Sequence, residues 1–331
     1  MSDCSSDDDQ GINDSDSEVE LDEEEKDVVE AVVDDGEEKS VKKRKVEKED
    51  KAVDPALFKD AFYFKTTRTS DLQTCFKTIC KIPGLKPDSP ITIDMNQTCL
   101  MFYARQHGIV LRSFWKEEAF QTFHCVKPYR IDISKKCLDG LTKKMSDSSE
   151  YIYIKPADVK NSNQQEGIVF GGKTAYKKAK DNSFGTFEVY VSAVDNPTPP
   201  RFPNLKLNWE IVDVSHKMET DLSRISKSVK FVTLHIEEKT ISWKSVSDIG
   251  DTSEVFSHEL NTAKDNLNAE FTFVKKFITV VTTASKINDQ IKIHFSDKQG
   301  QKAVPVTFEY SFCNTDTSES TLQIVIAPSN K

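Results

Sequence analysis

The stretch Asp195-Asn-Pro-Thr-Pro-Pro-Arg-Phe-Pro203 divides the chain after residue 60 into two parts of similar length. Four of its nine residues are proline, which fixes φ and lacks a backbone N–H donor. The stretch therefore cannot form a helix or a central strand, and we predict a stiff, extended connector. Phe202 is an aromatic residue in a segment that has no core of its own. It either packs back onto a neighbouring domain or borders a groove in which partners dock, and the two interpretations are compatible.

Charge is distributed unevenly along the chain. Residues 1–54 carry 22 acidic and 8 basic side chains and no aromatic residue, whereas the rest carries 32 acidic and 37 basic side chains. Such a segment cannot bury enough apolar surface to offset the entropy of an ordered chain. We therefore predict a disordered acidic tail over residues 1–58, followed by a mildly basic body. A mildly basic body is compatible with weak, sequence-independent contact with a polyanion.

A compact basic cluster lies within the acidic tail. It consists of Lys42, Lys43, Arg44 and Lys45, followed by Val46. Nuclear import receptors read clusters of this kind as extended, solvated peptides. The cluster therefore predicts a nuclear protein.

The cysteine count and the hydropathy pattern bear on the compartment. The chain has seven cysteines, an odd number, and none of them is spaced as Cys-x-x-Cys. This pattern favours free thiols in a reducing compartment, used mostly as small core residues. No apolar run approaches the roughly 18 residues that a membrane-spanning helix needs. We expect a soluble, intracellular protein.

Beyond the tail, short apolar runs and period-two alternation are typical of strands. Helices are predicted from Ser70 to Ile82, after Ser134, from Ser215 to Ser228 and from Lys275 to Ser285. Ser70 and Ser134 are the expected N-caps of the first two helices. In the first half, strands are predicted at 62–67, 91–94, 99–103, 109–114, 119–126, 129–133, 151–155, 167–171 and 186–194. In the second half they are predicted at 209–214, 230–236, 240–245, 254–260, 267–273, 290–295, 304–312 and 321–327.

The order strand, helix, strands, helix, strands occurs twice, once on each side of the connector. Because each half has two helices and many strands, we predict that each half is a curved antiparallel sheet with both helices on one face. The fold class is therefore α+β, with two similar domains at 59–195 and 206–331 joined by a linker at 196–205. This repetition is the strongest structural signal in the sequence.

The predicted helices share a basic outward face. On the first helix, Gln73, Lys77 and Lys81 lie off the apolar stripe and are expected to face outward. Lysines on one helix are usually only solvated, but four such helices on the same side of their sheets favour a shared surface for a polyanion. The basic residues of this surface are Lys77, Lys81, Lys135, Lys136, Lys143, Lys144, Lys217, Arg224, Lys227 and Lys275.

This repeated unit and its linker resemble the sliding clamps of DNA replication, the proliferating cell nuclear antigen family. Ala119-Phe-Gln-Thr-Phe-His-Cys125 resembles the end of a clamp strand pair that closes with Phe-x-x-Tyr-x-Cys. Val304-Pro-Val-Thr-Phe-Glu-Tyr310 resembles the family's Pro-Leu-x-x-Glu-Tyr strand, and Ile324-Val-Ile-Ala-Pro328 its Tyr-Leu-Ala-Pro ending. The likeness covers roughly residues 60–331, at the low identity seen in clamps of large DNA viruses, and has no counterpart for the tail.

The sequence departs from the family pattern in three places. Pro200-Arg-Phe-Pro203 stands where the family linker holds Leu-x-Ile-Pro, which changes the shape of the partner groove. Ala104 stands where a groove methionine is common, which is expected to widen the groove. Gln73 and Thr74 stand where clamps place lysines, so DNA contact on the first helix is expected to rest on Lys77 and Lys81.

The resemblance implies a DNA sliding clamp, or polymerase processivity factor, that performs no bond chemistry and needs no cofactor or metal. Its implied partners are double-stranded DNA, bound without sequence preference, DNA polymerase and other clamp-binding proteins, and a clamp loader. We expect a head-to-tail homotrimer, in which Thr186–Val194 of one subunit pairs with Ser253–Leu260 of the next because unpaired strand edges invite strand addition. The expected partner groove is apolar and shallow, and is bordered by Ala104, Pro200, Phe202, Pro203, Pro305, Val325, Ala327 and Pro328.

Two other classes of protein compete with the clamp. An enzyme would need a catalytic constellation, but the six histidines are scattered without His-x-x-x-His or other metal-ligand spacing. His124 and Cys125 are adjacent on a predicted strand, so they face opposite sides of the sheet and cannot form a nucleophile pair. The second competitor is a non-ring processivity or scaffold protein of the same fold, because herpesvirus processivity factors share the fold without always closing a ring.

Overall fold

The computed structural model describes residues 62–146, 149–157, 167–175, 184–194, 202–246, 253–260, 265–296, 304–312 and 319–329. The chain divides into a unit of residues 1–50 and a unit of residues 51–331, and every described residue belongs to the second. The predicted acidic tail with its basic cluster, and the connector up to Arg201, lie outside the described residues. Among the helices that are described, none is long and apolar enough to cross a membrane.

The described residues form four α-helices, at the four places where helices were predicted. They are α1 Thr69–Cys80, α2 Lys135–Lys144, α3 Ser215–Arg224 and α4 Lys275–Thr283. Ser134 caps α2 as predicted, since its side chain accepts a hydrogen bond from the backbone N–H of Cys137 at 3.2 Å. The predicted cap at Ser70 is wrong, because α1 begins at Thr69 with no side-chain cap. Helix α3 ends at Arg224, earlier than predicted, because Ile225 adopts extended backbone angles.

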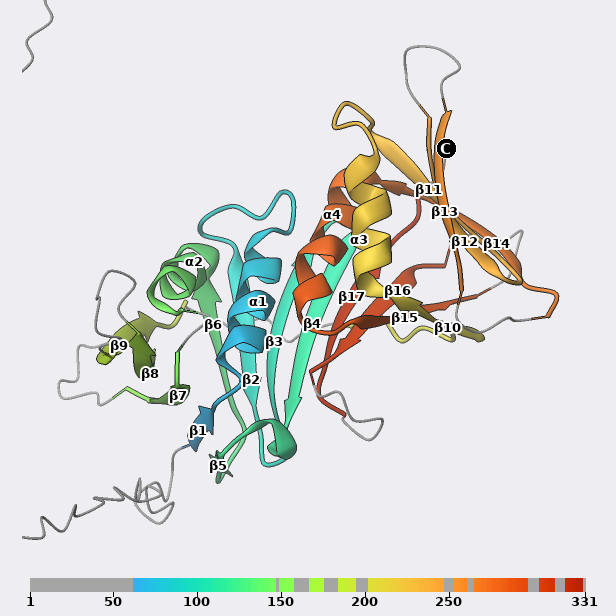
Figure 1. Cartoon of the computed structure of the whole chain (residues 1–331). Helices are drawn as coiled ribbons and strands as arrows, with labels where there is room; N and C mark the ends of the chain where they lie inside the picture. Colours follow the sequence, from blue (N-terminus) through green and yellow to red (C-terminus); the bar gives the residue numbers. More distant parts are fainter. Residues whose placement is uncertain are drawn as a thin grey trace, which may run out of the picture. The chain divides into compact units, whose positions relative to one another are not determined.

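The strands of the described residues form three antiparallel sheets (Figure 1). The first has the order β5-β1-β7-β8-β9, with bounds Thr122–Cys125, Phe62–Thr66, Tyr151–Pro156, Gly167–Ala175 and Phe184–Ser192. The third has the order β13-β12-β11-β14, with bounds Ser253–Glu259, Thr240–Val246, Phe231–Glu237 and Asn268–Val274. Two 3-10 turns, η2 Glu117–Ala119 and η3 Ala284–Lys286, complete the elements, and η2 shortens the strand that was predicted to begin at Ala119.

The second sheet is built from both halves of the chain. Its order is β10-β15-β16-β17-β4-β3-β2-β6, with bounds Trp209–Val214, Gln290–Phe295, Val306–Ser311, Thr321–Ile326, Ile109–Lys116, Cys99–Gln106, Pro90–Met95 and Tyr129–Ser134. The prediction of one separate sheet for each half is therefore wrong. Strand β17 and strand β4 would each be an edge within its own half, and they pair instead, from Thr321 opposite Phe114 to Ile326 opposite Ile109.

The two halves repeat the same strand order. The series β1-β7-β8-β9 in the first half matches β10-β15-β16-β17 in the second, and β6-β2-β3-β4 matches β14-β11-β12-β13. In this comparison β9 corresponds to β17, and β13 corresponds to β4. The strands β9 and β13 are edges of their sheets, whereas their counterparts β17 and β4 are joined. The predicted edge positions of these two strands are confirmed.

All four helices lie in one row over buried sheet faces (Figure 1). Helix α1 contacts α2 and α4, and α4 contacts α3. Beneath them, the ring of Phe76 on α1 meets Phe102 on β3 edge to face at 4.9 Å. The hydroxyl of Tyr310 donates to the carbonyl of Val281 on α4 at 2.9 Å. The apolar side of each helix is thus used for packing, which leaves its polar side outward.

A buried ion cluster attaches edge strand β13 to its neighbours. Nδ1 of His258 on β13 lies 2.8 Å from Asp221 Oδ2 on α3, and Nε2 lies 2.8 Å from Asp213 Oδ1 on β10. Asp213 is 2% exposed and Asp221 is 7% exposed. Hydrogen bonding to Asp213 raises the pKa of His258, with a smaller contribution from Asp221. A charged imidazolium has a donor on each nitrogen, so it satisfies both carboxylates at once.

Candidate nucleic-acid interface and docking groove

Lysines gather at two places on the helical side. Between α1 and α2, a cavity of about 620 Å³ is lined by Lys77, Lys81, Lys135 and Lys136. Beside α3 and α4, a cavity of about 740 Å³ has an apolar wall and four lysines, namely Lys227, Lys230, Lys275 and Lys276. Each half of the chain therefore contributes basic groups to the row of helices, as the repeated order predicts.

The predicted basic residues differ in whether their charged groups donate hydrogen bonds to other parts of the protein. Nζ of Lys275 donates to the carbonyls of Ile225 at 2.7 Å and Ser226 at 2.6 Å, so it holds the end of α3, and burial lowers its pKa. Nζ of Lys135 donates to the carbonyl of Leu85 at 3.0 Å. These two lysines have structural partners, which a sequence pattern does not reveal.

Other lysines of the set stand at the surface. Lys77 donates to Gln73 Oε1 at 2.8 Å, and Lys143 forms a pair with Asp139 at 2.6 Å. The exposed ion pair of Lys143 contributes little to stability, and the partner of Lys77 is a neutral amide, so both lysines keep a positive charge at the surface. Lys81, Lys136, Lys144, Arg224 and Lys227 are exposed, and Lys217 is half-buried.

The positions of two further lysines and one glutamine differ from the sequence-based prediction. Lys230 and Lys276 line the α3–α4 cavity, although they were not among the predicted site residues. Lys276 directly follows Lys275 at the start of α4, so two adjacent lysines in the sequence already indicate a basic helix start. Gln73 was predicted to face outward but is buried, because its Nε2 donates to the carbonyls of Met145 at 2.9 Å and Thr142 at 3.3 Å. It joins α1 to the end of α2.

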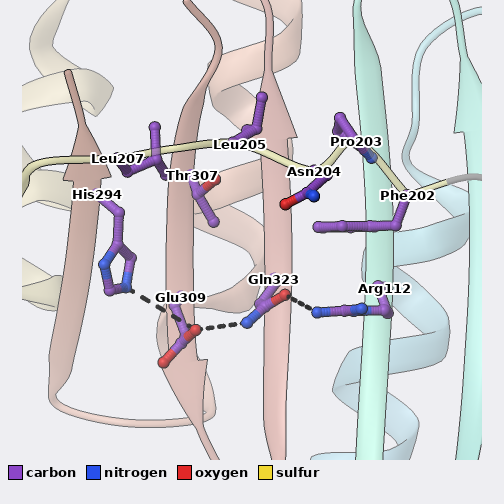
Figure 2. Close-up of a pocket in the computed structure, with 10 residues that line it drawn as sticks. All are labelled: Arg112, Phe202, Pro203, Asn204, Leu205, Leu207, His294, Thr307, Glu309 and Gln323. Carbon is purple, nitrogen blue, oxygen red and sulfur yellow. Dashed lines mark hydrogen bonds and ion pairs between the residues drawn. The ribbon is translucent and has the colours of Figure 1, made fainter.

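On the other side of the central sheet, the linker from Phe202 to Leu207 borders a pocket of about 440 Å³ (Figure 2). Four neighbouring strands supply its polar floor. Arg112 Nη2 donates to Gln323 Oε1 at 2.6 Å, and Gln323 Nε2 donates to Glu309 Oε2 at 2.6 Å. His294 Nε2 lies 3.8 Å from the same Glu309 oxygen. The floor is therefore a connected row of hydrogen-bonding groups across the sheet.

Phe202 lies over this row. The guanidinium carbon of Arg112 is 4.0 Å from the centroid of the Phe202 ring, which is a cation–π contact (Figure 2). Burial lowers the pKa of Arg112, although an arginine remains charged in proteins. Its Nε is buried and has no hydrogen-bond partner within the described part of the chain. Phe202 thus packs back onto the domain, as one interpretation predicts, and it also borders a pocket.

The other predicted groove residues are placed differently. Ala104 pairs with Leu111, one residue away from Arg112 on β4, so it faces the opposite side of the sheet and is 1% exposed. Its assignment to the groove is wrong. Val325 pairs with Thr307, which lines the pocket, but Val325 is itself buried.

One of the remaining members of the predicted groove lines this pocket. Pro203 does line it, whereas Pro305, Ala327 and Pro328 do not, and Pro200 lies outside the described residues. The N–H of Ala327 donates to the carbonyl of Gly108 at 3.0 Å, which ties the chain end to the β3–β4 turn. The pocket floor is polar rather than apolar. Period-two alternation carries this signal, because each of Arg112, Glu309 and Gln323 lies between two buried residues of its strand.

Comparison with known proteins identifies the class of fold. No family model matches the sequence, and no curated protein matches it. The structure has the fold of the DNA sliding clamps, with α+β architecture, several antiparallel sheets and few helices, as predicted. It is similar to the crystal structure of proliferating cellular nuclear antigen from Entamoeba histolytica, with a TM-score of 0.62 and 14% sequence identity. The match covers 82% of this chain and 99% of that chain.

Proposed function

We propose that this chain is a DNA sliding clamp that encircles duplex DNA and holds DNA polymerase on it. The observation that carries the proposal is the pair of matching free edges on β9 and β13. Inside the chain, their counterparts β17 and β4 form the joint between the two halves. Pairing β9 of one subunit with β13 of the next repeats that joint between copies. Head-to-tail repetition of one interface generates a closed ring when the rotation closes, and the family resemblance implies three copies.

The face of the ring that meets DNA is the row of helices α2, α1, α4 and α3. Phosphates alone need to be contacted for a grip that permits sliding, because contacts to phosphates carry no sequence information. We assign this contact chiefly to the exposed members of the basic set, Lys81, Lys136, Lys144, Arg224 and Lys227, together with Lys77 and Lys143. Lys135, Lys217 and Lys275 add positive potential from half-buried positions.

Neutralising four exposed lysines tests the DNA-binding part of the proposal. In Lys81→Gln, Lys136→Gln, Lys144→Gln and Lys227→Gln combined, affinity for duplex DNA should fall to the same extent for every sequence. Each lost phosphate contact lowers the slope of log affinity against log salt by about 0.9, so the slope should fall by roughly 3–4. The measurement is a salt titration of binding to two unrelated duplexes.

The matched control for this variant is Lys135→Gln with Lys275→Gln. Because these two lysines donate to backbone carbonyls, their loss should lower thermal stability and leave most of the salt slope in place. Equal salt slopes for the wild type and the four-lysine variant would contradict DNA contact through the helices.

We further propose that partners dock in the pocket between the linker and the central sheet. A stiff linker loses little entropy when a peptide lies beside it. Leu205, Leu207 and Phe202 offer apolar contact, while Arg112 and Glu309 offer a hydrogen-bond donor and acceptor. A partner segment with apolar or aromatic anchors and one polar group matches these features.

Phe202→Ala should weaken binding of a polymerase-derived peptide by about 1–3 kcal/mol, since the ring is one wall of the pocket. The free energy of unfolding should fall by no more than about 2 kcal/mol, because the half-buried Arg112–Phe202 contact lies between the exposed and the desolvated cases of a cation–π pair. Calorimetry of binding and of unfolding on the same variant checks both. Lys206→Ala, an exposed linker position outside the pocket lining, is the control and should bind normally. Destabilisation with intact affinity would show that Phe202 is only a packing residue.

The proposal includes no catalytic role. The described residues contain no group of three or more His, Cys, Asp or Glu side chains that could hold a metal ion. The basic cluster of the tail, Lys42 to Lys45, supports a nuclear location, and loading onto DNA is assigned to a clamp loader. A non-ring processivity protein of the same fold would keep the helices and the groove but would leave β9 and β13 unpaired.

A further inference from the structure

Tyrosines gather on the face of the first sheet that is turned away from the core. Tyr63 on β1 and Tyr153 on β7 share this face, because Tyr153 pairs with Lys65, two residues from Tyr63. Tyr190 on β9 pairs with Val169, two residues from the partner of Tyr153. The opposite face carries the core residues, and there Phe170 meets Phe76 of α1 edge to face at 6.0 Å.

Two glycines of β8 let these rings lie on the sheet. A Cβ at Gly171 would collide with the ring of Tyr153, and a Cβ at Gly167 would lie 2.8 Å from Tyr190 Oη. The two rings therefore reach over β8 from its two neighbouring strands. Glycine inside a strand weakens it, and often marks a place where another group approaches the backbone closely. Here the groups that approach the backbone of β8 are the rings of Tyr153 and Tyr190.

The tyrosine rings differ in how much of their surface is exposed to solvent. Tyr190 is 51% exposed and is one of four large hydrophobic residues exposed in the described part of the chain. Tyr153 is half-buried, lies against Tyr63 with ring centroids 5.9 Å apart, and donates its hydroxyl to Glu188. Burial, and then the bond to Glu188, raise the pKa of Tyr153, so its phenol is neutral. Tyr63 is buried, and on this face its ring is stacked with that of Tyr153.

Lysines stand among the tyrosines on this face. Lys65 Nζ is 4.3 Å from the centroid of the Tyr151 ring, and Lys155 Nζ is 5.5 Å from that of Tyr153. Two carboxylates near this face form ion pairs with lysines. Glu188 pairs with Lys155 at 3.2 Å, and Glu150 pairs with Lys173 at 2.6 Å. The described charges of this face thus leave one net positive charge, on Lys65.

We propose that this tyrosine face, made of Tyr63, Tyr151, Tyr153 and Tyr190 with Lys65 and Lys155, binds single-stranded nucleic acid. An open antiparallel sheet that presents aromatic rings stacks unpaired bases, and basic side chains beside the rings attract the phosphates. Duplex DNA does not fit this face, because its bases are already stacked on one another. The inference requires neither ring closure nor the lysines of the helices.

The experiment measures fluorescence anisotropy of labelled oligothymidylate and oligouridylate, each longer than the roughly 4–16 nucleotides that one single-strand site covers, with the full chain. Each of Tyr190→Ala and Tyr153→Ala should weaken binding about tenfold, since base–ring stacking is worth about 1–3 kcal/mol. Tyr190→Phe keeps the ring and should bind as the wild type does. Lys65→Gln should lower the salt slope by about 0.7.

A matched control separates this face from the helices. Lys81→Gln with Lys136→Gln alters the helical side and should weaken oligothymidylate binding less than Tyr190→Ala does. Binding of either oligonucleotide supports the proposal, and a preference for one of them identifies DNA or RNA as the strand. Three results would overturn it: no binding by the wild type, wild-type affinity in Tyr190→Ala, or a loss in the helix variant equal to that in the tyrosine variants. Because Tyr190 is exposed, its alanine variant tests the face even if Tyr153→Ala fails to fold.

Discussion

His258→Ala is expected to lower the free energy of unfolding by about 3–5 kcal/mol, the range for removing one partner of a buried ion pair. The imidazolium bridges Asp213 and Asp221 at 2.8 Å on each side, so its loss leaves two buried carboxylates without their shared cation. Urea unfolding of the two proteins at pH 6 gives the difference. His235→Ala is the matched control. His235 is a more exposed strand histidine, and its loss should cost no more than about 0.5 kcal/mol.

The difference in unfolding free energy between the wild type and His258→Ala should decrease as the pH rises. The pKa of His258 is raised in the folded protein, so the folded state binds the proton more tightly than the unfolded state does. The stabilisation is therefore complete below the unfolded value of about 6.5, as long as the aspartates are ionised. It is lost as the pH rises through the raised folded value. A wild-type-minus-variant difference that stays constant across this window would contradict the charged bridge.

Ser257→Pro is expected to separate the subunits. Leu260 donates its N–H to Lys239, on the β12 side of the chain. Because N–H groups alternate in direction along a strand, the N–H of Ser257 points to the free edge of β13. Proline removes that donor and spares the pairing with β12, and edge positions tolerate proline. Light scattering should show a monomer for Ser257→Pro, while Ser257→Ala, which keeps the N–H, should match the wild type. An unchanged mass in the proline variant would exclude β13 as the interface.

Much of the fold could be predicted from local patterns. Four helices and nearly all strands follow from apolar periodicity, and the repeated order led to the correct fold class. The joint between β17 and β4 could not be predicted, because Thr321–Ile326 and Ile109–Phe114 are far apart in sequence. Strand pairing at such a distance depends on which edges are left free after each half has folded, and periodicity carries no information about that.

The candidate sites were predicted less completely, for physical reasons. Arg112 on β4 and Ala104 on β3 lie on opposite faces of the sheet. This depends on the register between the two strands, which the sequence pattern does not define. Lys275 has the same sequence pattern as the exposed lysines, and only the position of the α3 carbonyls shows that its charge is engaged. The tyrosine face could not be predicted from the sequence, because its rings come from three strands that only the folded sheet brings together.

The mass of the full-length wild-type chain in solution tests the central claim most directly. Light scattering at micromolar concentration should give three times the chain mass of 37.5 kDa, as expected for a closed ring built from the β9–β13 joint. The same mass should persist across moderate salt concentrations, because strand pairing depends little on exposed charge. A mass of 37.5 kDa under these conditions would contradict the ring and favour a non-ring processivity protein of the same fold.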